Sequence, residues 1–345
     1  MGSMPVPSKA TNPMESLKKG LRAAGFKNAY LNRVALPEWW DDEIATDSGG
    51  FAEGLGLIAR NLGLDFKRLS KGEVCPKVFS GAKFKLVAGV KSADVKWATS
   101  LAFHAIEVAG LGCGQTDSQC SSSASDIRNE ILSSGPKCVD LANLLDWCWN
   151  HGIPIIHISE FPIGKKMDGL AARTGQGFGI AVASNHKQDS WLLFILAHEL
   201  GHICARHLEN SAVIVDQDVG KTPVDDEEKE ANSFAVELLT GRPGLQFSAP
   251  RWLSAEELAQ VCRKLGSALN IDPGVIALNY AEHSSKKQFA AANGALNIIY
   301  PDADAPTLIR ERMQERLSFS EIPPETCEWL LRLTGLAETV DCLSR

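Results

Sequence analysis

The sequence predicts an α+β fold in which helices at both ends of the chain flank a small β-sheet in its middle. Apolar residues recur with the 3.6-residue spacing of helices before residue 112 and again after residue 254. Between them, short runs rich in β-branched residues, such as 153–158 and 178–183, have the length and composition of strands. The 345 residues are 44% apolar and 22% charged, which is the composition of a globular protein.

Residues 14–110 are predicted to form a first, mostly helical unit. Its elements are predicted as helices at 14–24, 50–62 and 94–111 and a strand at 83–88. The stretch 111–126 that follows is polar and rich in small residues and has no periodicity, so it is the predicted linker. Residues 1–3 are interpreted as an expression scar, with Met4 as the native start.

A second unit is predicted over residues 127–245. Its elements are predicted as helices at 139–150, 191–207 and 225–240 and strands at 153–158, 169–172, 178–183 and 212–215. Acidic residues open the helix at 225–240, where negative charge complements the helix dipole. Residues 246–345 are predicted to be a helical C-terminal region that ends with a helix at 326–336.

Charge and hydropathy exclude two function classes. The sum of 35 basic and 42 acidic residues is −7, so a DNA-coating role driven by phosphate neutralisation is not expected. The longest apolar run, 191–197, is far shorter than the about 20 residues that span a membrane.

The chain opens without the pattern of a signal peptide, and its nine cysteines include no CxxC pair. We therefore expect reduced thiols and a cytoplasmic location.

The candidate metal-binding and catalytic residues of the second unit lie in the run His198-Glu199-Leu200-Gly201-His202. On a helix, residues four apart lie about 40° apart and ~6 Å along the axis, so both imidazoles can bind one Zn²⁺ at ~2.1 Å. Glu199 is rotated by ~100°, where it can reach a water molecule as general base. The alternative is a helix with two ordinary histidines. The apolar run before His198 argues against it, because buried imidazoles and a buried carboxylate need partners, which a metal supplies.

A third ligand is expected from the acidic start of the helix at 225–240. Seven and eleven residues separate Glu228 from Ala235 and Leu239, which face the core, so Glu228 shares their face of the helix. Glu227 has the same relation to the neighbouring apolar positions, whereas Glu230 points away. Spacing alone therefore leaves Glu227 and Glu228 open.

Over about residues 135–245 the sequence resembles the ImmA/IrrE family of metallopeptidases. The resemblance rests on His-Glu-Leu-Gly-His at 198–202 and on Glu-x-x-Ala-Asn-x-Phe-Ala-x-x-Leu-Leu, which begins 26 residues later. It implies a gluzincin-like core with a small sheet and two zinc-bearing helices. His198, His202 and Glu228 would bind Zn²⁺ and Glu199 would be catalytic. The alignment, and not the spacing, selects Glu228 over Glu227.

The resemblance also implies a function: a zinc-dependent endopeptidase, and so a hydrolase. Its protein substrate or partner would be an Xre-type helix-turn-helix repressor or antitoxin, acting in a stress response, in control of mobile elements or in a toxin–antitoxin system. Residues 14–110 contain no convincing helix-turn-helix, so the repressor is expected on a separate chain. Direct contact with nucleic acid or with a membrane is not expected.

Other residues are weaker candidates. Asn232, one turn after Glu228, is predicted to hold a ligating side chain in place. Tyr280 and His283 could stabilise the oxyanion of the tetrahedral intermediate, although core packing is the simpler role for Tyr280. His157, on a predicted strand, is a candidate substrate contact.

Two residues near the motif are predicted to have no role in it. His207, five residues past His202 on the predicted helix 191–207, should turn away from the paired histidines and lie at the surface. Cys204 should lie off the ligand face and serve packing.

The alternative function is a binding module. The zinc fold would then be a scaffold, and a toxic or regulatory action would arise from capturing a partner without cleavage. The substitution Glu199→Gln separates the two hypotheses, because it should abolish only an effect that needs cleavage.

Overall fold

The computed structural model describes residues 12–77, 83–85, 92–114, 122–162, 167–216, 226–284 and 288–337. Helices lie at both ends of the chain and a five-stranded sheet lies in its middle, so the predicted α+β class is confirmed. The predicted scar at 1–3 and residues 115–121 of the predicted linker lie outside the described residues.

The chain begins with short helical elements that pack on one another. They are α1 (Pro13–Ala23), α2 (Asn28–Tyr30), η1 (Leu31–Ala35), η2 (Asp42–Thr46), α3 (Ser48–Asn61) and α4 (Phe66–Leu69). Local capping explains where the two longest begin. The Asn12 side chain accepts the Met14 N–H at the start of α1, and the Asp47 side chain accepts two N–H groups at the start of α3. The helices predicted at 14–24 and 50–62 are confirmed.

The sheet has the strand order β1-β5-β3-β4-β2. Its strands are β1 (Lys83–Lys85), β2 (Ile155–His157), β3 (Gly169–Thr174), β4 (Gly177–Val182) and β5 (Val213–Asp216). β3 pairs antiparallel with both β4 and β5, while the two edge strands pair parallel with their neighbours. All five predicted strands are present, although residues 86–88 of the first prediction lie outside the described residues.

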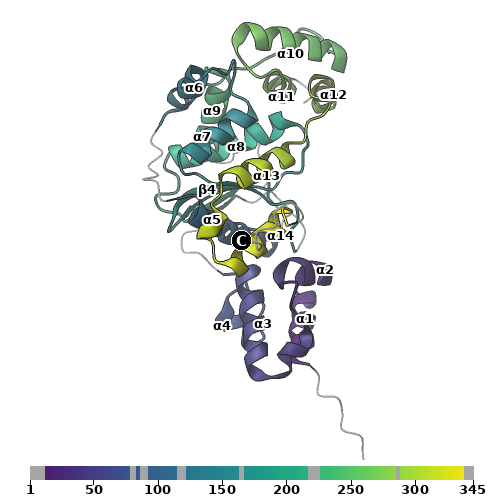
Figure 1. The fold of residues 1–345 in the computed structure, drawn as a ribbon. Coiled ribbons are helices and arrows are strands. Elements are labelled where there is room, and N and C mark those ends of the chain that lie inside the picture. Colours follow the sequence, from purple (N-terminus) through teal and green to yellow (C-terminus); the bar gives the residue numbers. More distant parts are fainter. Residues whose placement is uncertain are drawn as a thin grey trace, which may run out of the picture.

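Helices cover both faces of the sheet (Figure 1). On one face lie α5 (Ser92–Gly112) and α14 (Pro324–Thr334), and beyond them the N-terminal helices. On the other lie α7 (Leu141–Asn150), α8 (Asp189–Cys204) and α13 (Ala305–Arg316). The strands therefore alternate between two apolar cores: Leu170 and Ala172 join the first, and Ala171 joins the second. By the same alternation, Gly169 and His157 face the α8 side of the sheet.

The remaining helices build outward from α8. They are α6 (Ala124–Ser133), α9 (Asp226–Thr240), α10 (Ala255–Leu269), α11 (Pro273–His283) and α12 (Phe289–Ile299), with a short turn η3 (Phe319–Glu321) before α14. Ser123 and Asp126 form a capping box that starts α6 inside the polar stretch 111–126. Buried Arg128 on α6 donates to the carbonyls of Leu238 and Leu239, which satisfies the C-terminal end of α9 and holds that helix in place.

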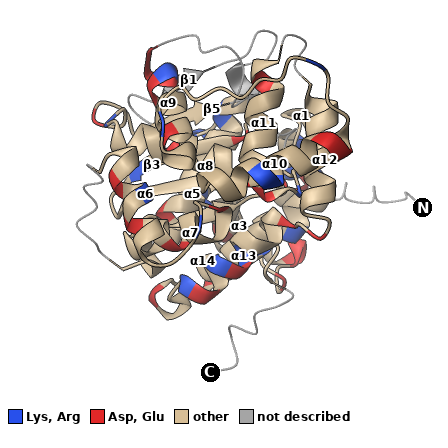
Figure 2. Cartoon of the chain, turned by 90° about the horizontal axis from the view of Figure 1, so that it is seen from above, with Lys and Arg blue, Asp and Glu red and all other residues tan. Residues whose placement is uncertain are grey.

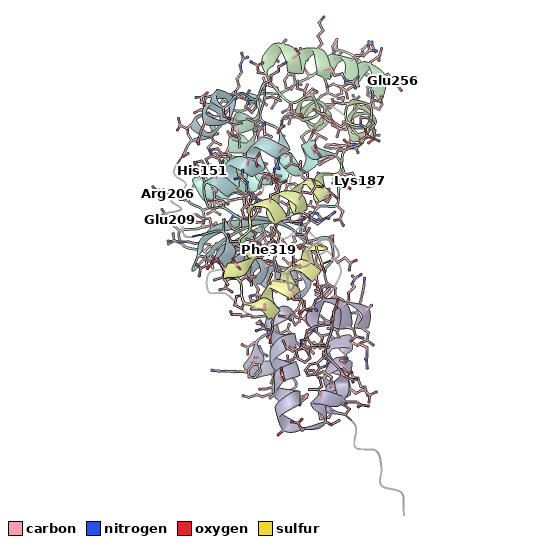
Figure 3. All side chains as sticks on the ribbon, viewed as in Figure 1. His151, Lys187, Arg206, Glu209, Glu256 and Phe319 are labelled. Carbon is pink, nitrogen blue, oxygen red and sulfur yellow. The ribbon has the colours of Figure 1, made fainter. Side chains whose placement is uncertain are left out.

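Two backbone contacts close the fold around the sheet. The Ala305 N–H donates to the Lys187 carbonyl at 2.9 Å, which joins α13 to the loop before α8 (Figure 3). The Ser318 N–H donates to the Gly112 carbonyl at 2.8 Å, and neighbouring Phe319 packs against the first core (Figure 3).

Acidic and basic residues are interspersed over the molecule when it is seen from above (Figure 2). Within the part of the chain that the structure describes, no helix is both long enough and apolar enough to cross a membrane.

Candidate metal centre

Helix α8 presents two histidines toward one point. His198 and His202 are four residues apart and therefore share a helix face. Both side chains are fully buried, and their Nε2 atoms lie 3.2 Å apart. The helix is buried on nearly all sides because the sheet packs on one side and α7, α9 and α11 on others, which explains its apolar composition.

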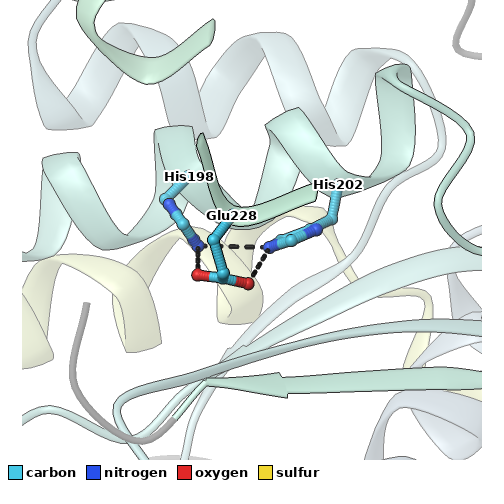
Figure 4. A group of neighbouring side chains, drawn as sticks. All are labelled: His198, His202 and Glu228. Carbon is cyan, nitrogen blue, oxygen red and sulfur yellow. Dashed lines mark hydrogen bonds and ion pairs between the residues drawn. The ribbon is translucent and has the colours of Figure 1, made fainter. Parts of the chain in front are cut away.

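Helix α9 brings a carboxylate to the same point (Figure 4). Glu228 Oε2 lies 3.4 Å from His198 Nε2, and Glu228 Oε1 lies 3.4 Å from His202 Nε2. The two helices approach closely because small residues meet where they cross: a Cβ on Gly201 would lie 3.1 Å from the Cα atom and from the carbonyl oxygen of Ala231. Glu228 is thus the carboxylate that lies beside both imidazoles.

Hydrogen bonds orient both imidazoles with Nε2 toward Glu228. His198 Nδ1 lies 3.0 Å from Asn232 Oδ1, an acceptor, so it carries the proton and Nε2 presents a lone pair. His202 Nδ1 lies 2.8 Å from His207 Nδ1, and His207 Nε2 lies 3.1 Å from Glu230 Oε2. Asn232 thus makes the contact expected of a residue that holds a ligand.

This geometry fits a tetrahedral metal ion. Donors bound to zinc at about 2.1 Å in tetrahedral directions lie about 3.4 Å from one another. The three donor–donor distances of 3.2, 3.4 and 3.4 Å match that value. Among the described residues, His198, His202 and Glu228 form the one group of His, Cys, Asp and Glu side chains that could hold a metal ion. Two nitrogens and one carboxylate leave a fourth position open, as in catalytic zinc sites.

Glu199 follows His198 in the chain but faces the sheet. Its side chain is fully buried. Gly169 at the start of β3 makes room for it, because a Cβ at that position would overlap the Glu199 carboxylate. The strand alternation that turns Gly169 toward α8 therefore decides where this carboxylate can lie.

The prediction for His207 is wrong. The helix ends at Cys204 and does not continue to 207, so His207 is buried and lies against His202. Burial lowers the pKa of His207, and the hydrogen bond to Glu230 opposes that effect. Glu230 is not part of the group formed by His198, His202 and Glu228, but it is connected to His202 through His207. No helix-stop residue such as glycine follows Cys204, so the sequence carried no signal for this end.

The weaker candidates Tyr280, His283 and His157 make hydrogen bonds to protein groups other than His198, His202 and Glu228. Buried Tyr280 donates its hydroxyl to Gln288, and exposed His283 donates to the Asn279 carbonyl of its own helix. His157 is buried, and its Nε2 lies 2.9 Å from the Ser184 carbonyl. Their proposed contacts with substrate stay predictions.

Among the cysteines that the structure describes, Cys204 departs from the prediction. Six described cysteines are free: Cys75, Cys113, Cys138, Cys148, Cys262 and Cys327. Cys204 packs against the second core, as predicted, but it is disulfide-bonded. The expectation of reduced thiols is therefore wrong for Cys204.

Comparison with known proteins agrees with this site. Residues 150–263, about a third of the chain, match the family model Peptidase_M78, described as the IrrE N-terminal-like domain. The matched segment contains His198, His202 and Glu228, the group that could hold a metal ion. Comparison with the curated proteins and with the solved structures found no match. The predicted resemblance is confirmed: residues 150–263 match the IrrE N-terminal-like domain of the ImmA/IrrE family.

Proposed function

We propose that this protein is a zinc-dependent endopeptidase with His198, His202 and Glu228 as metal ligands. The observation that carries the proposal is the convergence of these three donors at 3.2–3.4 Å inside a segment that matches a metallopeptidase family. A gluzincin-like core, with α8 and α9 as its zinc-bearing helices, is part of the proposal.

The mechanism assigns each step to a residue of this chain. His198, His202 and Glu228 would hold the zinc ion, which when bound would supply Lewis-acid polarisation of the scissile carbonyl and of a water molecule. Glu199 takes a proton from the attacking water and gives it to the leaving amine. The missing side chain at Gly169 leaves space for the Glu199 carboxylate between α8 and β3, and this fixes the place from which it accepts that proton. Asn232 holds His198 through its Nδ1.

The proposed substrate is an Xre-type helix-turn-helix repressor or antitoxin on a separate chain, in the cytoplasm. The family resemblance supports this class. The net charge of −7 suits a basic DNA-binding protein as substrate. We also propose that residues 14–110, 127–245 and 246–345 act as an N-terminal unit, a peptidase core and a C-terminal region, respectively.

Metal content tests the proposed centre. We expect one equivalent of zinc in the wild type and in Glu227→Ala, and none in Glu228→Ala, because only Glu228 lies beside both imidazoles. The variant Glu227→Ala is the matched control, since it removes the adjacent carboxylate from the same helix turn. A wild type that takes up no zinc when zinc is supplied would refute the proposal.

Cleavage is tested with Glu199→Gln, which should keep zinc and lose turnover. Cells that express either form are compared by mass spectrometry of protein N-termini. We expect new N-termini within helix-turn-helix proteins in the wild type alone. An effect on the cells that persists in zinc-loaded Glu199→Gln, with identical N-termini in both, would favour the binding module instead.

A further inference from the structure

The turn that ends α8 folds His207 back against the helix. The Arg206 N–H donates to the Ile203 carbonyl at 3.1 Å and the His207 N–H to the His202 carbonyl at 3.0 Å. Arg206 between them is left-handed, with a φ of 63°. These are the two hydrogen bonds and the left-handed residue of a Schellman motif. Arg206 itself lies at the surface, beside Glu209 (Figure 3).

A Schellman motif brings one particular pair of side chains together. The residue after the left-handed position packs against the residue five positions before it, and this contact is usually apolar. Here the pair is His207 and His202, so two imidazoles replace the apolar contact. The local backbone thus places a buried histidine against the Nδ1 atom of a metal ligand.

The hydrogen bonds along this chain of residues can run in only one direction when both imidazoles are neutral. The Glu230 carboxylate accepts, so His207 Nε2, at 3.1 Å, must donate to it. A neutral His207 then carries no proton on Nδ1, which accepts from His202 Nδ1 at 2.8 Å. His202 Nε2 is left with a lone pair that points toward Glu228 and His198.

We propose that His207, oriented by Glu230, is a positioning residue that holds His202 in the tautomer able to bind the metal. The inference rests on the proposed zinc site. His207 does for His202 what Asn232 does for His198, so each of the two histidines has one acceptor at its Nδ1. The two acceptors differ in origin: Asn232 comes from α9, and His207 comes from the turn that ends α8 itself.

Zinc affinity of the full-length protein, measured by competition with a chromogenic chelator, tests the proposal. We expect His207→Leu to bind zinc about 10–100-fold more weakly, the usual effect of losing such a partner. The variant His207→Asn should recover most of that loss, because its Oδ1 occupies the place of Nδ1 and accepts the same hydrogen bond. The control His151→Leu removes a histidine that bonds to the carbonyl of Trp147, and it should bind zinc like the wild type.

A second test replaces Glu230. Its side chain is largely exposed, so the replacement should not disturb folding. We expect Glu230→Gln to weaken zinc binding, because its amide can also donate and no longer fixes the direction of the hydrogen bonds. The control Glu209→Gln, an exposed carboxylate on the same turn, should have no effect.

The tautomer can be observed without metal. Nitrogen-15 shifts of the His202 ring should indicate the Nδ1–H form in the wild type and in His207→Asn, and a mixture of forms in His207→Leu. Equal zinc affinity and an equal tautomer in wild type and His207→Leu would overturn the inference while leaving the zinc site intact. A wild type that binds no zinc would overturn the proposed function and this inference together.

Discussion

The crossing of α8 and α9 makes a sharp prediction for Gly201→Ala. A Cβ at this position would lie 3.1 Å from Ala231 Cα and carbonyl oxygen and 3.2 Å from Phe234 Cδ1. Ordinary contacts begin at 3.4 Å, so the two helices must separate by about 0.3 Å. Two of the three contacts are with backbone atoms, so a change of rotamer cannot relieve them.

The free energy of unfolding follows from two opposing effects. Alanine in place of glycine inside a helix stabilises by about 1 kcal/mol. Overpacking at a tight contact costs about 1–3 kcal/mol. We therefore expect Gly201→Ala to be destabilised by about 0–2 kcal/mol. Zinc affinity should also fall by about tenfold, because a shift of about 0.3 Å in α9 exceeds the tolerance of ±0.2 Å in metal–ligand distances.

The matched control is Gly56→Ala in α3, where a Cβ would have no atom within 4 Å. It should gain the about 1 kcal/mol of helix propensity and keep the zinc affinity of the wild type. Both variants are compared by guanidinium unfolding and by chelator competition. If Gly201→Ala gains as much stability as Gly56→Ala and binds zinc as tightly, close packing at this crossing does not position Glu228 and the reasoning is refuted.

Three further substitutions test other parts of the structure. Gly169→Ala should displace the Glu199 carboxylate and lower proteolysis by about 10²-fold with zinc content unchanged, whereas Gly175→Ala, where a Cβ meets nothing, should do neither; equal proteolysis in both would contradict the assigned position of Glu199. Burial, together with nearby carboxylates, raises the pKa of Asp189 to about 6, because the folded state favours the protonated side chain over the ionised one. The contribution of this group to the free energy of unfolding is therefore complete below about pH 4 and is lost as pH rises through 6. Asp189→Asn should therefore leave the melting temperature unchanged at pH 4 and raise it at pH 8. The gain in the free energy of unfolding at pH 8 should be about 1 kcal/mol after allowance for solvent screening. An equal gain at both pH values would exclude the ionisation of Asp189 as its cause. Arg206→Gly should be about 1 kcal/mol more stable than Arg206→Ala, because only glycine adopts the left-handed turn without strain, and equal stability in denaturant would argue against that turn.

Local patterns predicted the strands, most of the long helices and half of the site, but not α6 or the end of α8. The five strands follow from short β-branched runs bounded by turn residues, and the long helices follow from apolar periodicity, because both signals are confined to a few neighbouring residues. The pair His198 and His202 could likewise be predicted, since a spacing of four residues determines a shared helix face whatever else surrounds the helix.

Contacts between elements could not be predicted in this way. Spacing left Glu227 and Glu228 equal, and the structure distinguishes them through the crossing at Gly201 and Ala231, two residues that lie 30 positions apart in the chain. The sheet order places β5 between β1 and β3 and depends on packing against both cores. The sequence of a single strand does not indicate that order.

The sequence by itself determined that a buried helix carries His-Glu-x-x-His and that an acidic helix follows it, because helical periodicity is a property of the local chain. Only the tertiary structure decided why Gly169 must lack a side chain and that His207 returns to His202, and it placed Glu228, which the family alignment had selected, beside both histidines. Each of these depends on two segments approaching within a few ångströms. In the case of His207, the approach depends on the left-handed backbone conformation of Arg206. Arginine is not a residue type that indicates this conformation.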